Sequence, residues 1–427
     1  MRLKLQTCAA IAIVAIMLAA PASASADEIS DWNRNLFEAA RLNVPPTSPL
    51  AITRNAALVQ SAVFDAVNGI ERRFTPVHVD PAAPAGASKR AAAVQAAYAM
   101  LIRLYPSQTA ALSAKRTDSL AAIDDSQASI DLGISWGQTV ADAIWAWRLT
   151  DGITPAPPPF LGGFNVGQWR PTPPGFLSGA GVNFSYMTPW VIESPSQFRP
   201  AGPPALTSDR YTADFNETKT MGSLNSTSRT DDQTLFSRFW AVSTASAYWN
   251  QIANSLADKE HFSFSKRARL LASLNLAMAD AAIGCWEAKY TYVFWRPVTA
   301  IPLANTDGNP ATIEDLSFTT LLITPNHPEY PSGHSCVSGS AGEILARTFG
   351  AHKKLTVSSD APEMAGVVRS YDGFPEILQE IKNARIFAGI HFRSACDDGQ
   401  QLGIGVADYV RDNALKHVRA DQADDDN

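Results

Sequence analysis

Cysteine and histidine are both scarce in this chain of 427 residues, which contains four cysteines and seven histidines. Cys8 falls in an apolar N-terminal stretch, and the other three form an odd number without zinc or redox spacing. This pattern excludes a disulfide framework and a thiolate zinc site. We therefore expect Cys285, Cys336 and Cys396 to be small buried residues.

An excess of charge of one sign is also missing. Charged residues make up 18% of the chain, and the formal net charge is −6. We therefore expect neither a nucleic-acid partner nor attraction to an anionic membrane surface. The 46% of hydrophobic residues is ordinary for a globular protein and sufficient for a large core. The acidic stretch RADQADDDN at 419–427 is predicted to be a solvated tail.

A run of about 18 uninterrupted apolar residues, as a membrane-spanning helix needs, is absent. The N-terminus has a shorter run, in which Arg2 and Lys4 precede AAIAIVAIMLAA and the small residues PASASA follow. This order predicts a signal peptide over residues 1–26, with cleavage after Ala26 or Ala24; a membrane anchor is the alternative. We expect an exported protein, periplasmic or secreted, without stable membrane insertion after cleavage.

Alternating strand patterns are few and short, whereas helical spacing of apolar residues is frequent. It occurs in 54–70, 88–105, 135–149, 229–258 and 265–290. Residues 151–207 are dense in proline and glycine, which predicts a long irregular connection of a kind that often serves a site. The sequence predicts a mostly α fold of helical bundles, two packed four-helix-bundle-like units with long Pro/Gly-rich loops. The N-terminal helical region is assigned to 27–205 and the C-terminal one to 206–427.

The segment KYTYVFWRP carries two cations seven residues apart, Lys289 and Arg296. If the segment is one helix, both project from the same face, and Pro297 then ends it. Two cations held together in this way need an anion between them. The alternative is two unrelated surface cations whose stems lie along apolar neighbours.

The segment NHPEYPSGHSC, residues 326–336, holds two histidines around a Pro-Ser-Gly loop. A helix that begins near His334 would present free backbone N–H groups and the positive end of its dipole to an anion. Ser332 can donate its hydroxyl, and Gly333 allows close approach of the backbone. His334 is placed to transfer a proton; the alternative is a capping or core histidine.

The segment ARIFAGIHFRSACDDG contributes Arg385 and His391, with Gly389 as a break that lets both reach one centre. Arg385 offers planar bidentate donors to an oxyanion. His391 can supply a neutral ring nitrogen as nucleophile or ligand. Alone, this pair would be read as solvated; with the other two segments it predicts a site for a multiply charged oxyanion.

The ordered pattern K-x6-R-P, P-S-G-H and R-x5-H resembles the signature of the vanadium-dependent haloperoxidases. This family shares its active-site plan with type 2 phosphatidic acid phosphatases and bacterial acid phosphatases. The segments VFDAVNGI, GQWRPTPPG, RTDDQTLFSRFW and LNLAMADAAIGCWEAKYTYVFWRP are also similar to bacterial members. The resemblance therefore covers most of the chain after the signal peptide.

This resemblance implies a vanadate cofactor, in a site that phosphate can also occupy. It implies that vanadate is held by Lys289, Arg296, Ser332, Gly333, Arg385 and His391. His391 would bond to vanadium, and His334 would be the acid–base residue, with Lys289 also acting in catalysis. Bound vanadate would act as a Lewis acid that activates hydrogen peroxide to oxidise a halide, with an organic acceptor as a further partner.

Two residues bear on the halide. His327 lies seven positions before His334. In the family that the chain resembles, bromide-oxidising members have a histidine at this position and chloride-oxidising members have a phenylalanine. This implies bromide or iodide rather than chloride, and Trp286 would form an apolar wall of the halide pocket. The alternatives are a loop histidine bonded to the backbone and a core tryptophan.

Two positions depart from the phosphatase pattern. Ala384 stands where that pattern has a serine, and Ala395 where it has an aspartate. Both differences favour the haloperoxidase. A soluble acid phosphatase with a phosphohistidine at His391 is the alternative, and a non-catalytic oxyanion-binding protein is the third.

Four acidic residues are candidates for supporting the site. Asp397 and Asp398 are candidates for orienting His391, and Asp280 and Glu287 for pairing with the site cations. A solvated or structural role is the alternative for Asp280 and Glu287. The sequence does not indicate an oligomeric state.

Overall fold

Helices form nearly all of the regular structure in the computed structural model, which describes residues 27–418. The α-helices are α1 (Glu28–Leu42), α2 (Pro49–Glu71), α3 (Lys89–Leu104), α4 (Thr109–Ala121), α5 (Gln127–Arg148), α6 (Asp209–Gly222), α7 (Asp231–Val242), α8 (Ala245–Lys259), α9 (Phe264–Tyr292), α10 (Pro297–Ala300), α11 (Gly333–Phe349), α12 (Phe374–Phe387) and α13 (Arg393–Asn413). Strands β1 (Leu355–Ser358) and β2 (Val368–Tyr371) pair antiparallel, with Leu355 opposite Tyr371. The predicted mostly α fold is confirmed. The predicted signal peptide and the acidic tail lie outside the described residues.

Side-chain caps begin most of the long helices. An N-cap oxygen accepts a backbone N–H of the first turn at Asp27, Ser48, Ser88, Ser126, Ser208, Thr230, Thr244 and Ser263. Thr230 does so in a capping box with Gln233. Because Thr244 caps a second start, the helical segment 229–258 forms two helices, α7 and α8. Ser332 is the N-cap of α11 and makes no such bond.

The connection over residues 151–207 is irregular, as predicted, with a short 3-10 helix at Val182–Tyr186. It is fastened to the last turns of α9. The carbonyl oxygen of Ala180 accepts hydrogen bonds from Nε1 of Trp286 at 3.0 Å and from the hydroxyl of Tyr290 at 2.7 Å. This connection therefore covers the end of α9 that carries Lys289.

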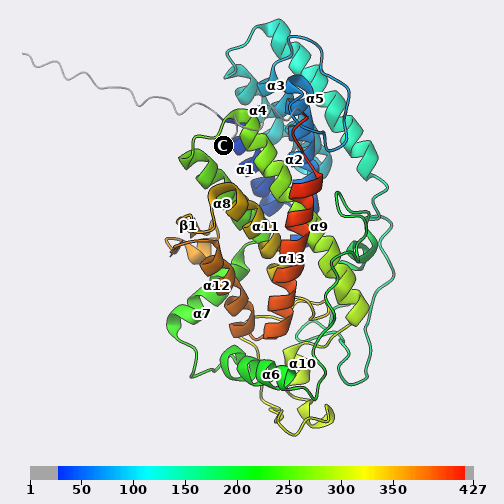
Figure 1. The fold of residues 1–427 in the computed structure, drawn as a ribbon, viewed down its shortest axis with the longest axis vertical. Helices are drawn as coiled ribbons and strands as arrows, with labels where there is room; N and C mark the ends of the chain where they lie inside the picture. The colour runs from blue at the N-terminus through cyan, green and yellow to red at the C-terminus, as the bar shows by residue number, and fades with distance from the viewer. Residues whose placement is uncertain (1–26, 419–427) are drawn as a thin grey trace, which may run out of the picture.

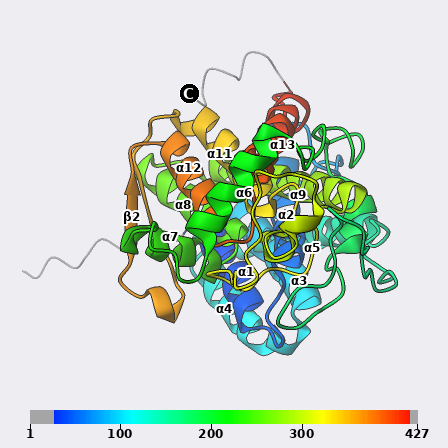
Figure 2. The ribbon, with the colours of Figure 1, turned by 90° about the horizontal axis from the view of Figure 1, so that it is seen from below.

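Two sets of three helices form the framework. Helices α2, α3 and α5 pack against one another, α9, α11 and α13 do the same, and α2 packs on α9. Figure 1 shows α2 to α5 at one end of the molecule, α6 and α10 at the other, and α9 and α13 running between them. Seen from below, α6 lies across that second end (Figure 2), in contact with α10, α12 and α13. One large apolar core includes residues of both sets, and the boundary between 205 and 206 stays a prediction.

The two helix sets share a packing device that is also visible in the sequence. The pattern D-x-G-x-x-x-G-x-x-V-A-D occurs at 131–142 in α5 and at 397–408 in α13. A Cβ on Gly137 would lie 2.3 Å from the carbonyl oxygen of Ala92 in α3, and one on Gly403 would lie 2.1 Å from that of Cys336 in α11. Both glycines therefore permit backbone contact between helices. This contact holds α13 against the first turns of α11.

Buried aspartates repeat in the same way. Asp280 in α9 accepts three consecutive backbone N–H groups, of residues 190–192, at 2.7 to 2.9 Å. Asp65 in α2 accepts those of residues 77–79 at the same distances. The proposal that Asp280 pairs with the site cations is therefore wrong. Its carboxylate binds the N–H groups of the loop at residues 190–192 instead, and clustered amide donors of this kind stabilise a buried charge.

Helix α9 is the central element. It is the described helix that is long and apolar enough to cross a membrane, and 89% of its most apolar window is buried inside the protein. Surrounding helices cover it, as expected for a core helix.

Candidate active site

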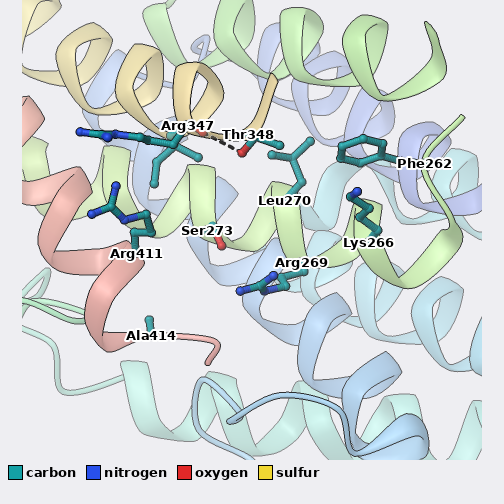
Figure 3. Close-up of a pocket in the computed structure, with 10 residues that line it drawn as sticks. Phe262, Lys266, Arg269, Leu270, Ser273, Arg347, Thr348, Arg411 and Ala414 are labelled. Atoms are coloured by element: carbon teal, nitrogen blue, oxygen red, sulfur yellow. Dashed lines mark hydrogen bonds between the residues drawn. The ribbon is translucent and has the colours of Figure 1, made fainter. Parts of the chain in front are cut away.

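A pocket of about 250 Å³ near the start of α9 is lined by cations but lies apart from the predicted motifs. Lys266, Arg269, Arg347 and Arg411 surround it (Figure 3). Arg347 binds Glu343, and Arg411 binds Asp408 and Asp412. From Ser273 in this pocket to Lys289 is about 24 Å along the helix at 1.5 Å per residue. The predicted residues gather instead at the other end of α9.

Lys289 and Arg296 are both buried, but not on one helix. Helix α9 ends at Tyr292, and Val293 adopts a left-handed conformation with φ 49°. Arg296 is the N-cap of α10, whose first residue is Pro297. The prediction of one helix ended by Pro297 is therefore wrong, because the proline begins the next helix, a position its fixed φ favours. The turn still brings both cations to the same loop.

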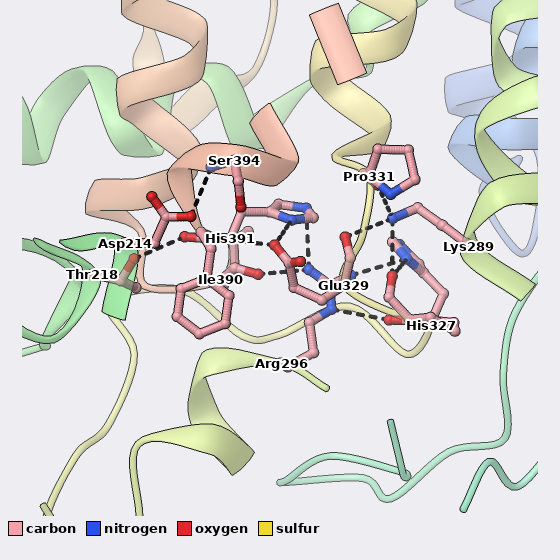
Figure 4. A network of polar contacts seen from close by, with 12 residues as sticks. Asp214, Thr218, Lys289, Arg296, His327, Glu329, Pro331, Ile390, His391 and Ser394 are labelled. Carbon is pink, nitrogen blue, oxygen red and sulfur yellow. Dashed lines mark hydrogen bonds and ion pairs between the residues drawn. The ribbon is translucent and has the colours of Figure 1, made fainter. Parts of the chain in front are cut away.

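Arg296 connects the two histidine segments (Figure 4). Its Nη1 donates to the carbonyl oxygen of Ile390 at 2.6 Å and lies 3.1 Å from Nε2 of His391. Its Nε donates to the carbonyl oxygen of His327 at 3.0 Å, and its Nη2 lies 2.9 Å from Nδ1 of that ring. Because a guanidinium can only donate, Nε2 of His391 is an acceptor.

Lys289 holds the loop before α11. Its Nζ donates to the carbonyl oxygens of Pro328 at 2.9 Å, Glu329 at 3.0 Å and Pro331. Burial lowers the pKa of Lys289 to about 8. The loop is therefore wrapped around a buried ammonium, and three carbonyl dipoles offset part of its desolvation.

His391 has a carboxylate partner that the sequence analysis missed, Glu329. Nδ1 of His391 lies 2.8 Å from Oε1 of Glu329, and the backbone N–H of Phe392 donates to the same oxygen at 2.9 Å. The available signal was an acidic residue between two prolines in the loop joining His327 to His334. Burial raises the pKa of Glu329 to about 7, while the charge of Arg296 lowers it.

The acidic residues proposed as supports have other partners. Asp397 accepts from Lys382 at 2.9 Å, whereas Asp398 accepts from Arg210 and from the hydroxyl of Tyr330. Glu287 pairs with Arg199 at the surface. These assignments were wrong because Asp397 and Asp398 lie in the first turns of α13, whose register turns them toward neighbouring helices rather than toward His391.

The first turn of α11 has unused donors. The hydroxyl of Ser332 is buried and has no hydrogen-bond partner among residues 27–418. No side chain caps the turn, so the N–H groups of Gly333 and His334 are not satisfied by a cap. His334 donates from Nε2 to the carbonyl oxygen of Trp240 at 3.2 Å. Since a carbonyl only accepts, Nδ1 of His334 holds the lone pair.

Arg385 reaches the site from the last turn of α12. It is 4% exposed, and its Nε and Nη1 have no partner within the described part of the chain. Gly389, with φ 78°, follows the end of α12 and redirects the chain, so the predicted break is confirmed. Burial lowers the pKa of Arg385 to about 10.

His327 and Trp286 lie together at the edge of this cluster. Their ring centroids are 4.9 Å apart, and a Cβ on Gly333 would lie 3.0 Å from the Trp286 ring. Nδ1 of His327 also lies 3.2 Å from the carbonyl oxygen of Pro328. The geometry permits an apolar wall beside a histidine, and the halide role of both residues stays a prediction.

The electrostatics favour an anion. Burial lowers the pKa of His391, His327 and His334 well below 6.5, and the neighbouring arginines lower it further. The rings are therefore neutral at pH 7, while three buried cations remain and Glu329 is the carboxylate hydrogen-bonded to the network. A buried excess of positive charge is stabilised by an anionic ligand.

These residues fit vanadate. The unpartnered donors of Ser332 and Arg385, with the uncapped turn of α11, suit the oxygens of a tetrahedral or trigonal-bipyramidal oxyanion. Nε2 of His391 offers the lone pair that a histidine-bound vanadate needs. Among the described residues, no three or more His, Cys, Asp and Glu side chains form a cation-binding group. The donor set is thus that of an oxyanion site.

Comparison with known proteins finds similarity to vanadium haloperoxidases. The family model for the VCPO second helical-bundle domain matches residues 269–420. The chain is 28% identical over 262 residues to vanadium chloroperoxidase of Curvularia inaequalis, covering 45% of this chain and 42% of that protein. It is 25% identical to a structure described as the first bacterial vanadium-dependent iodoperoxidase, with a TM-score of 0.79, covering 91% of this chain and 97% of that one. The chain is therefore similar to vanadium haloperoxidases in fold over most of its length, and its residues 269–420 match the second helical-bundle domain of that family model.

Two further haloperoxidase structures share the fold. The apo and holo forms of a bacterial vanadium-dependent chloroperoxidase match with TM-scores of 0.67 and 0.68 at 16% and 17% identity. The match to the Curvularia haloperoxidase spans less than half of that protein's length. The three motifs singled out in the sequence lie at the end of α9, in the loop before α11, and between α12 and α13.

Proposed function

We propose that the protein is an exported vanadium-dependent haloperoxidase that oxidises bromide or iodide, rather than chloride, with hydrogen peroxide. One observation carries the proposal: the buried donors of Ser332 and Arg385 have no hydrogen-bond partner in the described part of the chain, and they belong to the two segments that also carry His334 and His391. A helix or loop built only for stability would satisfy such groups.

In this proposal His391 holds vanadate through Nε2, and Ser332, Gly333 and Arg385 bind its oxygens. Arg296 and Lys289 complete the positive surroundings. Vanadate would supply a Lewis acid that activates hydrogen peroxide toward halide. Arg296 donates to Nε2 of His391 in this structure. Vanadate could bind at Nε2 only if Arg296 gave up this contact and donated to a vanadate oxygen instead.

His334 moves the proton. Its Nε2–H is held by the carbonyl of Trp240, which leaves Nδ1 free to accept a proton from incoming peroxide and to return it. Because its pKa is well below 6.5, the ring is neutral at pH 7 and begins as a base. The positive side chains beside it stabilise the negative charge that develops at the oxygens.

The halide preference is supported by His327 beside Trp286. Position 327 carries the histidine of the bromide-oxidising pattern that the chain resembles, and the Trp286 ring 4.9 Å away offers an apolar wall beside it. An organic acceptor of the oxidised halogen is part of the proposal, without a chemical class.

A paired assay tests the reaction. Apo-protein is mixed with orthovanadate and assayed for bromination of a phenolic dye with peroxide, beside hydrolysis of an aryl phosphate. Vanadate-dependent bromination without phosphatase activity is expected, with rates for iodide and bromide exceeding the rate for chloride. Phosphatase activity inhibited by vanadate would establish the phosphatase instead. Full activity in His391→Ala would refute the site, and Glu287→Gln serves as the matched control.

Export is tested separately. The protein is expressed with its N-terminus intact, and the exported fraction is sequenced from its first residue. Mature chains beginning at Asp27 or Ser25 are expected. Uncleaved protein confined to the cytoplasm would contradict export without affecting the enzymatic proposal.

A further inference from the structure

The hydrogen bonds of His391 determine which ring nitrogen carries its hydrogen. Arg296 can only donate, so Nε2, at 3.1 Å from Nη1, holds the lone pair. The hydrogen is therefore on Nδ1, where Oε1 of Glu329 accepts it at 2.8 Å. Two independent partners thus specify one tautomer.

Glu329 is itself held on several sides. Its backbone N–H donates to the carbonyl oxygen of Phe294 at 2.9 Å, and its own carbonyl oxygen accepts from Lys289 at 3.0 Å. Its side chain is fully buried, and Oε1 also accepts the N–H of Phe392. A carboxylate fixed from three segments can set the angle of the ring it contacts.

We propose that Glu329 is the positioning residue that fixes His391 as its Nδ1–H tautomer and directs Nε2 into the oxyanion site. The proposal deepens the proposed function and rests on it. The hydrogen bond from Nδ1–H to Oε1 of Glu329 also makes Nε2 a stronger donor of its lone pair.

A merely structural role has a different signature. If the carboxylate served only to accept the N–H of Phe392, any other acceptor could replace it without changing the tautomer or the orientation of the His391 ring. Glu329→Gln keeps an acceptor for both N–H groups and removes the charge. Glu329→Ala removes both, so the two variants separate orientation from charge.

The first measurement determines the tautomer of His391 in the apo-protein. Long-range proton–nitrogen NMR on histidine-labelled apo-protein reports the His391 tautomer, assigned with His391→Ala. Wild type and Glu329→Gln are expected to show the Nδ1–H form, and Glu329→Ala a weaker preference for it, because Arg296 alone then specifies the tautomer. Titration calorimetry with orthovanadate is expected to show about a 10- to 100-fold weaker affinity for Glu329→Ala and a smaller loss for Glu329→Gln.

The control is Glu287→Gln. Glu287 lies on the same helix as Lys289, and its carboxylate binds Arg199. This variant should match wild type in both measurements. An unchanged tautomer and unchanged vanadate affinity in Glu329→Ala would overturn the proposal. If that variant does not fold, unchanged affinity in Glu329→Gln overturns it. A wild-type protein with aryl phosphatase activity and no bromination would defeat the haloperoxidase function while the NMR result still decides the role of Glu329.

Discussion

At the scale of the residue, the site is defined by polar atoms without protein partners. Nε and Nη1 of Arg385 are buried without a partner among the described residues. Arg296 instead donates hydrogen bonds to His391, His327 and Ile390. Two arginines drawn from similar motifs thus differ in what they cost the folded protein. The buried charge of Arg385 is expected to lower the stability of the apo-protein, whereas the hydrogen bonds of Arg296 help to hold the loops together.

Arg385→Ala is expected to separate binding from stability. Removing a buried charge without a partner should leave the unfolding free energy of the apo-protein unchanged or raise it by about 1 kcal/mol. Vanadate affinity should fall about 10- to 100-fold, because charge-assisted hydrogen bonds are lost. Urea unfolding and calorimetry measure the two effects. A marked loss of apo-protein stability would show that Arg385 already has a protein partner.

Lys289 is expected to give a pH-dependent stability. Burial lowers its pKa from 10.5 to about 8, so between these values the unfolded chain binds more protons. Stability of the apo-protein should therefore rise with pH across this window, by about 2–3 kcal/mol. The measurement is the difference in unfolding free energy between wild type and Lys289→Met from pH 7 to 10.5. A difference that stays flat would contradict the lowered pKa.

At the scale of the element, one helix start departs from the others. Ser88 and Ser332 occupy equivalent places, each as N-cap of a helix, α3 or α11, that packs on a glycine-bearing partner. Ser88 accepts the N–H of Ala91 at 3.2 Å, and Ser332 accepts none. The sequence predicted a helix that begins near His334, but it could not show that the Ser332 hydroxyl leaves the helix uncapped, because that depends on the side-chain rotamer.

These two serines form a matched pair. Ser88→Ala should cost about 1 kcal/mol of stability, the usual value of an N-cap, and leave vanadate affinity unchanged. Ser332→Ala should cost less than about 0.5 kcal/mol and weaken vanadate binding. Thermal unfolding and calorimetry on both variants give the comparison. A full capping loss at Ser332 would mean that its hydroxyl serves the helix.

At the scale of the whole molecule, two similar helix sets carry one site. Where the second set has Ser332, Gly333 and His334, the first has Ser88, Lys89 and Arg90. Arg90 binds Glu28 at 2.5 Å and Lys89 binds Glu71 at 2.6 Å. In the first set, ion pairs therefore fill the position that the oxyanion site has in the second set. The first set packs against the second through α2 and α9.

The repeated glycines test this division. Gly137→Ala and Gly403→Ala each place a methyl group against a backbone carbonyl, so both should lose about 2 kcal/mol or more of stability. Gly403→Ala also pushes α13 from the first turns of α11, so it alone should weaken vanadate binding. Calorimetry at a temperature where both variants remain folded checks this. Equal losses of affinity would show that the two helix sets act as one unit.

The sequence by itself determined the helical class, the irregular connection over 151–207, the break at Gly389 and the residues of the oxyanion motifs. These depend on local periodicity, on caps and on the chemistry of nearby side chains, all of which are readable along the chain. Tertiary structure alone decided that Glu329, rather than Asp397 or Asp398, contacts His391, and that Val293 reverses the chain before Arg296. Glu329 and His391 are 62 positions apart. Their contact exists because the packing of α13 on α11 brings the two loops together, and no local pattern records that packing.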